Sequence, residues 1–490
     1  MTLYKLTAAQ IREKFVSGEF SAEEITRYFL KRAKKFDSQV HGYLKIYEER
    51  ALKKARELDE KKKRGEKMGL LAGVPIAIKD NIQIKDEITT CASKFLENYT
   101  APFDATVTKN IENEDGIIIG KTNLDEFAMG ASCEYSAFGP THNPWNLDYT
   151  PGGSSGGSAA VVSARFAPIS LGSDTGGSIR QPASFTGIVG FKPTFGRVSR
   201  NGLVAFGSSF DQIGPFTNCV EDVAMIMEVL GRPCQNDSTS IQEPAENYLG
   251  AIKQSITGKK VGVPWGFIQA QSEEIQTNFN EALKKLTDLG VETVDVDISL
   301  QKYAIAVYYI LSTAEASTNL SRFDGVRFGK RAKSAKNLTE LYNHSRCEGF
   351  GAEVKKRILL GTFVLSAGYQ DAYYRKAQKV RTLMIEQYKK AFATCDVIAL
   401  PTTPTTAFEM FSMQDPFKMY LQDACTIGAN VAGLPAISVP SGYAENKCPL
   451  GLQIVGPQMG DSEVLRFAYH FQKNSGVAGN IPPLFDKEEK

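Results

Sequence analysis

This 490-residue chain contains a stretch rich in glycine and serine, Pro151-Gly-Gly-Ser-Ser-Gly-Gly-Ser158, followed by Leu171-Gly-Ser-Asp-Thr-Gly-Gly-Ser-Ile-Arg180. Glycine occupies ten of the 52 positions from Gly139 to Gly190, against 42 positions in the whole chain. Glycine at this density allows tight turns and a close approach of the backbone to other groups. We therefore expect the functional site to lie in this region.

Short apolar runs and helical patterns alternate on both sides of this stretch. The run Leu71-Ala-Gly-Val-Pro-Ile-Ala-Ile78 ends abruptly at Lys79 and predicts a buried strand. The first 65 residues predict helices, with capping-box patterns at Thr7–Gln10 and Ser21–Glu24. Interleaved helices and strands are typical of an α/β fold. Further helices are predicted over 218–230, 275–289, 303–319 and 353–392, and further strands over 294–298, 397–400, 436–439 and 450–455.

Composition and charge argue against several classes of protein. The chain has 57 Lys and Arg against 55 Asp and Glu, and this net charge of +2 argues against a broad nucleic-acid footprint. No apolar run approaches the ~18 residues that span a bilayer, so we expect no membrane association. Eight scattered cysteines without a C-x-x-C pair predict reduced thiols and a cytoplasmic protein. Four histidines leave little scope for imidazole chemistry.

Two short patterns in the glycine-rich region suggest chemistries that the rest of the sequence does not complete. Gly152-Gly-Ser-Ser-Gly156 matches the G-x-S-x-G elbow of α/β-hydrolases, which needs a histidine further along the chain. The downstream histidines are His344 and His470, and neither lies in a distinctive loop. Asp174-Thr-Gly176 matches the aspartic-protease triplet, whose mechanism needs a second carboxylate from a second triplet that the chain lacks. Both interpretations are therefore disfavoured.

A lysine is the remaining candidate for activating a serine in this sequence. A serine hydroxyl is a poor nucleophile unless a base takes its proton. A lysine amine serves as a base only when it is neutral, and burial favours the neutral form because desolvation disfavours the ammonium ion. Lys79 follows eight apolar residues, which is a setting that buries an amine.

The whole block from Pro151 to Thr194, together with the strand Val74-Pro-Ile-Ala-Ile-Lys79, resembles the amidase signature enzymes. The resemblance extends over essentially the whole chain. It implies an α/β fold with one large domain, in which a central mixed β-sheet is flanked by helices on both faces. A helical segment, 1–65, would pack on an amidase domain, 66–490. That domain would contain a catalytic block at 71–216, and substrate-pocket and partner-facing helices at 300–435.

The resemblance also implies the catalytic residues. In the family, a lysine acts as the base through a serine held by a cis peptide, and residue matching makes these Lys79 and Ser154. The nucleophile is then Ser178. Asp174 would hold the nearby loop, and Arg180 would be a structural tie rather than a catalyst. The backbone N–H groups that would form the oxyanion hole, helped by two adjacent glycines, are those of Thr175, Gly176, Gly177 and Ser178.

The C-terminal half is most similar to one branch of the family, the glutamine-hydrolysing subunits of tRNA-dependent amidotransferases. The stretches Asn319–Gly329, Gly349–Ile358 and Asp423–Asn430 carry this likeness. Glutamine is a zwitterion, so its α-carboxylate calls for an arginine and its α-ammonium for an aspartate. The alternative is a free-standing amidase for small carboxamides, which would not need such a pair. An inactive scaffold is disfavoured because all the catalytic residues are present. By resemblance, glutamine is bound by Tyr309, Arg357, Asp423 and Met129.

The resemblance further implies partners that this chain does not contain. In this branch the chain supplies ammonia for converting Glu-tRNA(Gln) to Gln-tRNA(Gln), and Asp-tRNA(Asn) stays open as a second substrate. A B subunit binds the misacylated tRNA, uses ATP and Mg²⁺, and receives the ammonia through a tunnel, while a small C subunit completes the heterotrimer. We expect no cofactor or metal in this chain, because it has no P-loop, no G-x-G-x-x-G and no metal-ligand cluster.

Overall fold

The apolar runs of the sequence form one mixed β-sheet in the computed structural model, which describes residues 2–413 and 415–487. Within these residues the sheet has eleven strands, in the order β1-β3-β2-β4-β6-β5-β10-β11-β9-β7-β8. The strands are β1 (Tyr43–Ile46), β2 (Pro75–Lys79), β3 (Ile117–Thr122), β4 (Ile169–Asp174), β5 (Val189–Lys192), β6 (Gln212–Thr217), β7 (Lys260–Val263), β8 (Glu292–Asp295), β9 (Val397–Pro401), β10 (Ala436–Tyr443) and β11 (Pro449–Val455).

The direction of the strands explains where the functional residues meet. β2 runs parallel to both of its neighbours, β3 and β4, while β4 pairs with β6 in the antiparallel direction. The carboxyl ends of β2 and β4 therefore lie at the same edge of the sheet, which brings Lys79 close to Asp174. Every residue of β2 is buried, as the apolar run predicted. The predicted α/β fold with a central mixed sheet is confirmed.

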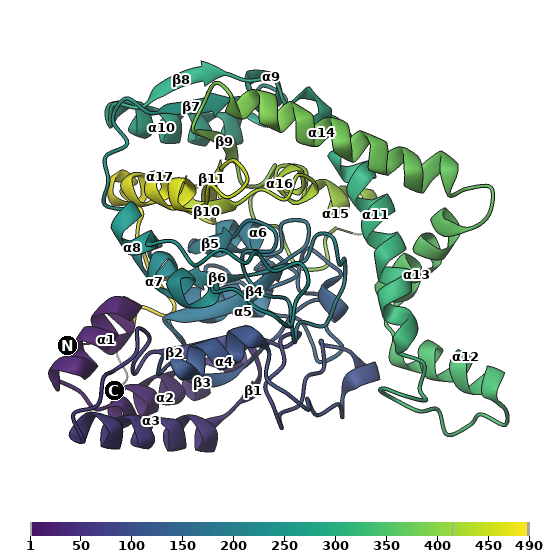
Figure 1. Cartoon of the computed structure of the whole chain (residues 1–490), viewed down its shortest axis with the longest axis horizontal. Helices are drawn as coiled ribbons and strands as arrows, with labels where there is room; N and C mark the ends of the chain where they lie inside the picture. The colour runs from purple at the N-terminus through teal and green to yellow at the C-terminus, as the bar shows by residue number, and fades with distance from the viewer. Residues whose placement is uncertain (1, 414, 488–490) are drawn as a thin grey trace.

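Helices flank this sheet, as Figure 1 shows, and α11 to α14 extend to one side of it. No helix among the described residues has both the length and the apolar character that crossing a membrane requires. The helices are α1 (Ala8–Ser17), α2 (Ala22–Val40), α3 (Glu48–Lys63), α4 (Thr106–Asn113), α5 (Gly156–Ser163), α6 (Arg180–Thr186), α7 (Val220–Leu230), α8 (Tyr248–Ala251), α9 (Trp265–Ile268), α10 (Glu273–Asp288), α11 (Ala304–Asn319), α12 (Leu338–Gly349), α13 (Ala352–Leu365), α14 (Lys376–Phe392), α15 (Pro416–Leu421), α16 (Ile427–Val431) and α17 (Asp461–Asn474).

The N-terminal segment is joined to the sheet by backbone and side-chain contacts. Both predicted capping boxes form, one at Thr7 and one at Ser21. The segment also contributes β1, which pairs antiparallel with β3. Its buried side chains belong to the same hydrophobic cluster as those of the central strands and of α17. The boundary between residues 65 and 66 stays a prediction, since the segment shares its sheet and core with the rest of the chain.

Two predicted elements differ from the observed ones. The strand predicted over 294–298 is found at Glu292–Asp295, because β8 is an edge strand that pairs only with the four residues of β7. The helix predicted over 353–392 is interrupted between α13 and α14. Ser366 has extended backbone angles, and Gly368 has a φ of 84°, a left-handed conformation that glycine adopts readily. The predicted helix is therefore interrupted by the backbone conformation at Ser366 and Gly368, although the pattern of apolar residues continues across them.

Candidate active site

Lys79 places its amine among three serine hydroxyls at the edge of the sheet. Its Nζ lies 2.8 Å from Oγ of Ser154, 2.7 Å from Oγ of Ser155 and 3.0 Å from Oγ of Ser173. The side chain is completely buried. Ser154 and Ser155 precede α5, and Ser173 belongs to β4, so the two halves of the glycine-rich block converge on the end of β2.

Burial gives this amine the properties of a base. Desolvation lowers the pKa of Lys79 to about 7, while the more distant carboxylates of Asp125 and Asp174 oppose that shift. No carboxylate of the described residues forms an ion pair with Lys79. Hydroxyl groups can accept hydrogen bonds from a neutral amine without stabilising an ammonium ion as a carboxylate would. A substantial fraction of Lys79 is therefore neutral near pH 7.

The hydrogen bonds of the three serines show which of their hydroxyl groups can give a proton to Lys79. A neutral amine has two N–H donors and one lone pair. Ser155 donates its own hydroxyl hydrogen to the carbonyl oxygen of Ser173, at 3.1 Å, and so accepts from Lys79. Neither Ser154 nor Ser173 has such a competing acceptor among the described residues, and Ser173 also accepts from the side-chain amide of Asn81 at 2.9 Å. The hydroxyls of Ser154 and Ser173 are thus both available to donate to the lone pair of Lys79, and the family resemblance assigns this role to Ser154.

A cis peptide bond joins Gly153 to Ser154, as the family resemblance implied. The N–H of Gly153 donates to Oε1 of Gln181 at 2.9 Å, and the carbonyl of Ser154 accepts from the N–H of Asp125 at 3.2 Å. A Cβ atom on Gly153 would lie 2.1 Å from Oδ2 of Asp125, so a larger residue would displace that carboxylate. The contacts hold Ser154 from both sides and explain the glycine before it.

The loop after β4 presents a group of backbone donors beside Ser178. The Ser178 side chain is 9% exposed, whereas Lys79 and Ser154 are completely buried. Within residues 2–413 and 415–487, the N–H groups of Gly176, Gly177 and Ser178 have no hydrogen-bond acceptor. Gly177 has a φ of 145°, and a Cβ atom there would lie 2.2 Å from Oγ1 of Thr426. Free N–H groups on a tightly folded loop are suited to hold an oxyanion.

A buried ion pair holds this loop in place. Arg180 donates from Nε and Nη2 to the two carboxylate oxygens of Asp174, each at 3.0 Å, and both side chains are fully buried. Burial alone would raise the pKa of Asp174, but Arg180 and Asn430 hold it below its usual value. Arg180 also donates to the carbonyl of Thr426. These contacts fit the predicted structural roles of Asp174 and Arg180.

A second loop contact involves Thr175, whose hydroxyl donates to Oδ1 of Asp211 at 2.7 Å. Asp211 also accepts from the backbone N–H groups of Phe206 and Gly207. Burial raises the pKa of Asp211 to about 6. The Thr175 hydroxyl therefore already has a hydrogen-bond partner in Asp211. The backbone N–H groups of Gly176, Gly177 and Ser178 have none among the described residues, so they are available to a ligand.

The predicted substrate residues form a separate charged group on the helical side of the molecule. Arg357 on α13 donates from Nε to Oε1 of Glu353 at 2.8 Å, and its guanidinium packs 5.3 Å from the ring centre of Tyr309. Its terminal nitrogens have no acceptor among the described residues. The Tyr309 hydroxyl lies 3.4 Å from Oδ2 of Asp423. Both ionic groups, Arg357 and Asp423, are buried, and neither forms an ion pair with the other.

Asp423 is a buried carboxylate without a cationic partner within salt-bridge distance in the described part of the chain. Burial raises its pKa to about 7, although Arg357 partly opposes this shift. A buried carboxylate in this state gains stabilisation from a cation that approaches it. The group can thus bind a ligand that carries an ammonium ion, while the free nitrogens of Arg357 can bind a carboxylate.

The site also contains residues that the sequence interpretation did not assign. Ser155 and Ser173 both contact Lys79, and Tyr420 donates to Glu353 at 3.2 Å. Ser155 and Ser173 lie within the quoted motifs, so their position beside assigned residues was the available signal. Met129, assigned to the substrate pocket, is fully buried in a hydrophobic cluster with Phe127, Phe206, Phe350 and Val354. Its role in binding stays a prediction.

The two histidines downstream of the G-x-S-x-G pattern contact residues outside the glycine-rich block. His344 contacts Ser334 and His470 contacts the carbonyl of Gln254, so neither approaches Ser154. Among the described residues, no group of three or more His, Cys, Asp and Glu side chains is arranged to hold a metal ion.

Comparisons with known proteins identify relatives that match almost the whole chain. The family model described as Amidase matches residues 24–465. The A subunit of glutamyl-tRNA(Gln) amidotransferase from Protochlamydia amoebophila (strain UWE25) is 55% identical over 99% of this chain and 99% of its own length. The protein of the same name from Chlamydia felis (strain Fe/C-56) is 51% identical over the full length of both.

Solved structures of similar fold also match almost the whole chain. The crystal structure of the A subunit of glutamyl-tRNA(Gln) amidotransferase from Thermotoga maritima has a TM-score of 0.81 and 41% identity, and the match covers 98% of this chain and 97% of that one. A bacterial aryl acylamidase of the amidase signature family has a TM-score of 0.86 and 25% identity, and the match covers 99% of both chains. The fold is thus shared by relatives whose names differ.

The Asp174–Arg180 pair makes a prediction about stability. Arg180→Met removes the cation and leaves a buried carboxylate uncompensated, so the free energy of unfolding should fall by about 3–5 kcal/mol in urea denaturation. Arg27→Met is the matched control, because Arg27 pairs with Glu23 on the exposed surface of α2 and its loss should cost less than about 1 kcal/mol. Equal losses in the two variants would contradict the structural role of Arg180.

Proposed function

The chain belongs to the amidase family, and from this premise we propose that it is the glutamine-hydrolysing A subunit of a glutamyl-tRNA(Gln) amidotransferase. The chain is an enzyme of that family, and its full-length relatives at 55% and 51% identity carry this name. The observation that carries the chemical part of the proposal is the buried Lys79 amine in contact with Ser154. The ammonia released would convert Glu-tRNA(Gln) to Gln-tRNA(Gln).

The first chemical step is the attack of Ser178 on the side-chain amide of glutamine. As the Ser178 Oγ bonds to the amide carbon, its proton passes to Ser154, and the proton of Ser154 passes to the neutral amine of Lys79. The route uses the 2.8 Å contact between Lys79 and Ser154. The carbonyl oxygen becomes an oxyanion, which the free N–H groups of Gly176, Gly177 and Ser178 can bind.

The intermediate then collapses and releases ammonia. The carbon–nitrogen bond breaks, and the proton held by Lys79 returns through Ser154 to the leaving nitrogen. A γ-glutamyl ester on Ser178 remains. Water, activated by the same lysine and serine, attacks this ester, so that glutamate leaves and the Ser178 hydroxyl is restored. One lysine thus acts as base and acid in turn.

The charged group around Arg357 supports glutamine as the substrate. The free nitrogens of Arg357 would bind the α-carboxylate, and Asp423, with the Tyr309 hydroxyl beside it, would bind the α-ammonium ion. In a site for apolar amides, these two buried charges would cost free energy of desolvation and would have no charged group of the substrate to bind. The alternative of a free-standing amidase for small carboxamides is therefore the weaker one for this chain.

The surface of the substrate-side helices supports a partner subunit. Leu359 on α13, Leu383 on α14 and Phe417 on α15 have between 58% and 70% of their surface exposed. Exposed apolar side chains that form one contiguous patch mark protein interfaces, and in our proposal these three belong to such a patch. In our proposal a B subunit binds the tRNA, ATP and Mg²⁺, and a small C subunit completes the heterotrimer. All eight cysteines are unpaired, which supports the cytoplasm as its location.

The catalytic proposal predicts the effect of three substitutions. Ser178→Ala should abolish glutamine hydrolysis, because no ester can form. Lys79→Ala and Ser154→Ala should each lower kcat by several orders of magnitude. The double variant should be little worse than either single variant, since both residues act in one proton route. Released ammonia measures the rates, and wild-type turnover in Ser178→Ala would refute the mechanism.

The pKa of Lys79 predicts the pH dependence. The reaction needs the neutral amine, so kcat at saturating glutamine should rise with pH through a midpoint of about 7 and level off above it. The glutamine concentration must be saturating because burial also raises the pKa of Asp423 to about 7. The ionisation of Asp423 would change glutamine binding, and therefore kcat/KM, over the same pH range. A kcat that is constant between pH 5 and pH 9 would contradict Lys79 as the base.

The substrate assignment predicts a selective defect in Asp423→Asn. The variant loses a charged hydrogen-bond acceptor, so the KM for glutamine should rise about 10- to 150-fold. The KM for 4-carbamoylbutanoate, which is glutamine without its α-amino group, should change less than threefold. Both are measured by ammonia release. An equal rise for the two substrates would show that Asp423 does not bind the ammonium ion.

A further inference from the structure

A pocket of ≈ 950 Å³ lies between residues 95–100 and the loop that precedes α12. None of its lining residues belongs to the catalytic group around Lys79. A second hollow of ≈ 710 Å³ shares Arg331 and Lys333 with it, so the two hollows adjoin, and together they are called the groove here. The loop is fixed to the body, because the N–H of Lys330 donates to the carbonyl of Phe95 and the N–H of Ala332 donates to Ser345.

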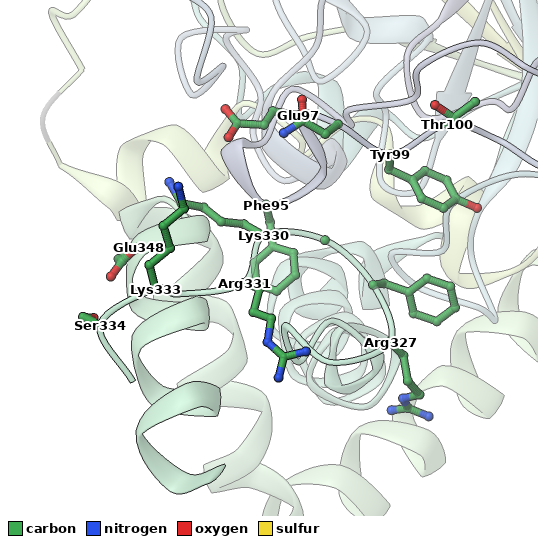
Figure 2. Close-up of a pocket in the computed structure, with 13 residues that line it drawn as sticks. Phe95, Glu97, Tyr99, Thr100, Arg327, Lys330, Arg331, Lys333, Ser334 and Glu348 are labelled. Atoms are coloured by element: carbon green, nitrogen blue, oxygen red, sulfur yellow. The ribbon is translucent and has the colours of Figure 1, made fainter. Parts of the chain in front are cut away.

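The groove carries a surplus of positive charge. Its lining contains five cationic side chains against two anionic ones: Arg327, Lys330, Arg331, Lys333 and Lys336 against Glu97 and Glu348. Arg327 forms an exposed ion pair with Asp324. Lys330, Arg331 and Lys333 form no ion pair within the described residues. Figure 2 shows the guanidinium groups of Arg327 and Arg331 extending to the same side of the pocket, away from Glu97.

Aromatic rings line the same pocket. Tyr99 and Phe328 contact each other edge to face, with ring centres 6.3 Å apart, and Phe328 is 40% exposed. The hydroxyl of Tyr99 accepts a hydrogen bond from Gln83, which fixes the orientation of its ring. At the base of the pocket, Phe95 stacks on Phe350 at 4.7 Å. Rigid rings beside unpaired cations are therefore available to a ligand.

We propose that this groove binds a single-stranded segment of RNA. Lys330, Arg331 and Lys333 would contact successive phosphates, and an unpaired base would stack on Phe328. Two adjoining hollows that are both lined by cations fit a polyanion better than one small anion. An acidic peptide would satisfy the charges but would not use the exposed ring. The inference goes beyond glutamine hydrolysis and does not depend on it.

The near-neutral total charge of the chain does not oppose this inference. Net charge averages over the whole surface, whereas an ion responds to charges within about 10 Å at moderate salt. The sequence expectation of no broad nucleic-acid footprint concerns the entire chain. A local groove that binds a few nucleotides is compatible with that expectation.

The test uses the full chain and a fluorescent single-stranded RNA of about ten nucleotides, a length within the range bound by known single-strand grooves. Anisotropy at several salt concentrations gives the affinity and its salt dependence. The triple variant Lys330→Glu, Arg331→Glu and Lys333→Glu should bind at least about tenfold more weakly. Its slope of log K against log salt should be shallower by about 2, since each lost phosphate contact contributes about 0.7.

A matched control separates the groove from charge in general. Lys376, Lys379 and Lys390 on α14 are exposed and, within the described residues, form no ion pair, so their triple change to Glu alters the net charge similarly. This control should retain at least half of the wild-type affinity. Phe328→Ala should weaken binding about 5- to 150-fold with an unchanged salt slope, because it removes stacking alone.

Three outcomes would overturn the proposal. They are equal losses in the two triple variants, no wild-type binding at low salt, and displacement of the RNA by a glutamate-rich peptide as effectively as by unlabelled RNA. The last would assign the groove to an acidic protein segment. Glutamine hydrolysis is measured in the same variants and should stay at the wild-type rate, so a failure of RNA binding is distinguishable from a failure of the proposed glutaminase.

Discussion

The burial of one lysine amine without a carboxylate partner is the constraint on which the site depends. In water this amine would be protonated at pH 7, and a nearby carboxylate would keep it protonated inside the protein. The surroundings of Lys79 instead consist of serine hydroxyls, while the nearest acidic groups are engaged elsewhere: Asp174 with Arg180, and Asp125 with backbone N–H groups. Hydroxyl neighbours can both accept from the amine and pass it a proton. The same arrangement therefore lowers the pKa of Lys79 and fits the proposed proton route.

The architecture supplies this environment through parallel strands and glycine. Because β2 and β4 are parallel, their carboxyl ends place Lys79 and Ser173 at one edge of the sheet. The glycines then let two loops approach that edge, as the 2.1 Å and 2.2 Å contacts of a hypothetical Cβ at Gly153 and Gly177 demonstrate. The charged group of Tyr309, Arg357 and Asp423, which we propose binds the substrate, is built on other elements, namely α11, α13 and the segment before α16. The two proposed groups therefore rest on separate elements, and they are linked at the loop after β4, where the Thr426 hydroxyl donates to the carbonyl of Gly176.

Much of this could be predicted from the sequence, for identifiable physical reasons. The run before Lys79 is apolar throughout, so it indicated a buried strand and a buried amine. The observed elements that differ from the predicted ones lie where the sequence pattern is ambiguous. The helical spacing of apolar residues over 353–392 continues across Gly368, where the structure shows that the predicted helix is interrupted. Ser155 and Ser173 were missed because a serine in a motif carries no sign of where its hydroxyl points. The groove at Lys330 was missed because the total charge hides a local surplus.

The most direct test of the central claim is the ionisation of Lys79 itself. In protein labelled with ¹³C at the lysine ε carbon, the NMR signal that disappears in Lys79→Met belongs to this residue. The assignment matters because Lys192, at the end of β5, is also buried and its pKa is likewise lowered by burial to about 7. The account predicts that this signal titrates with a pKa of about 7. A signal that remains that of an ammonium ion up to about pH 10, the range of an ordinary lysine, would contradict the account.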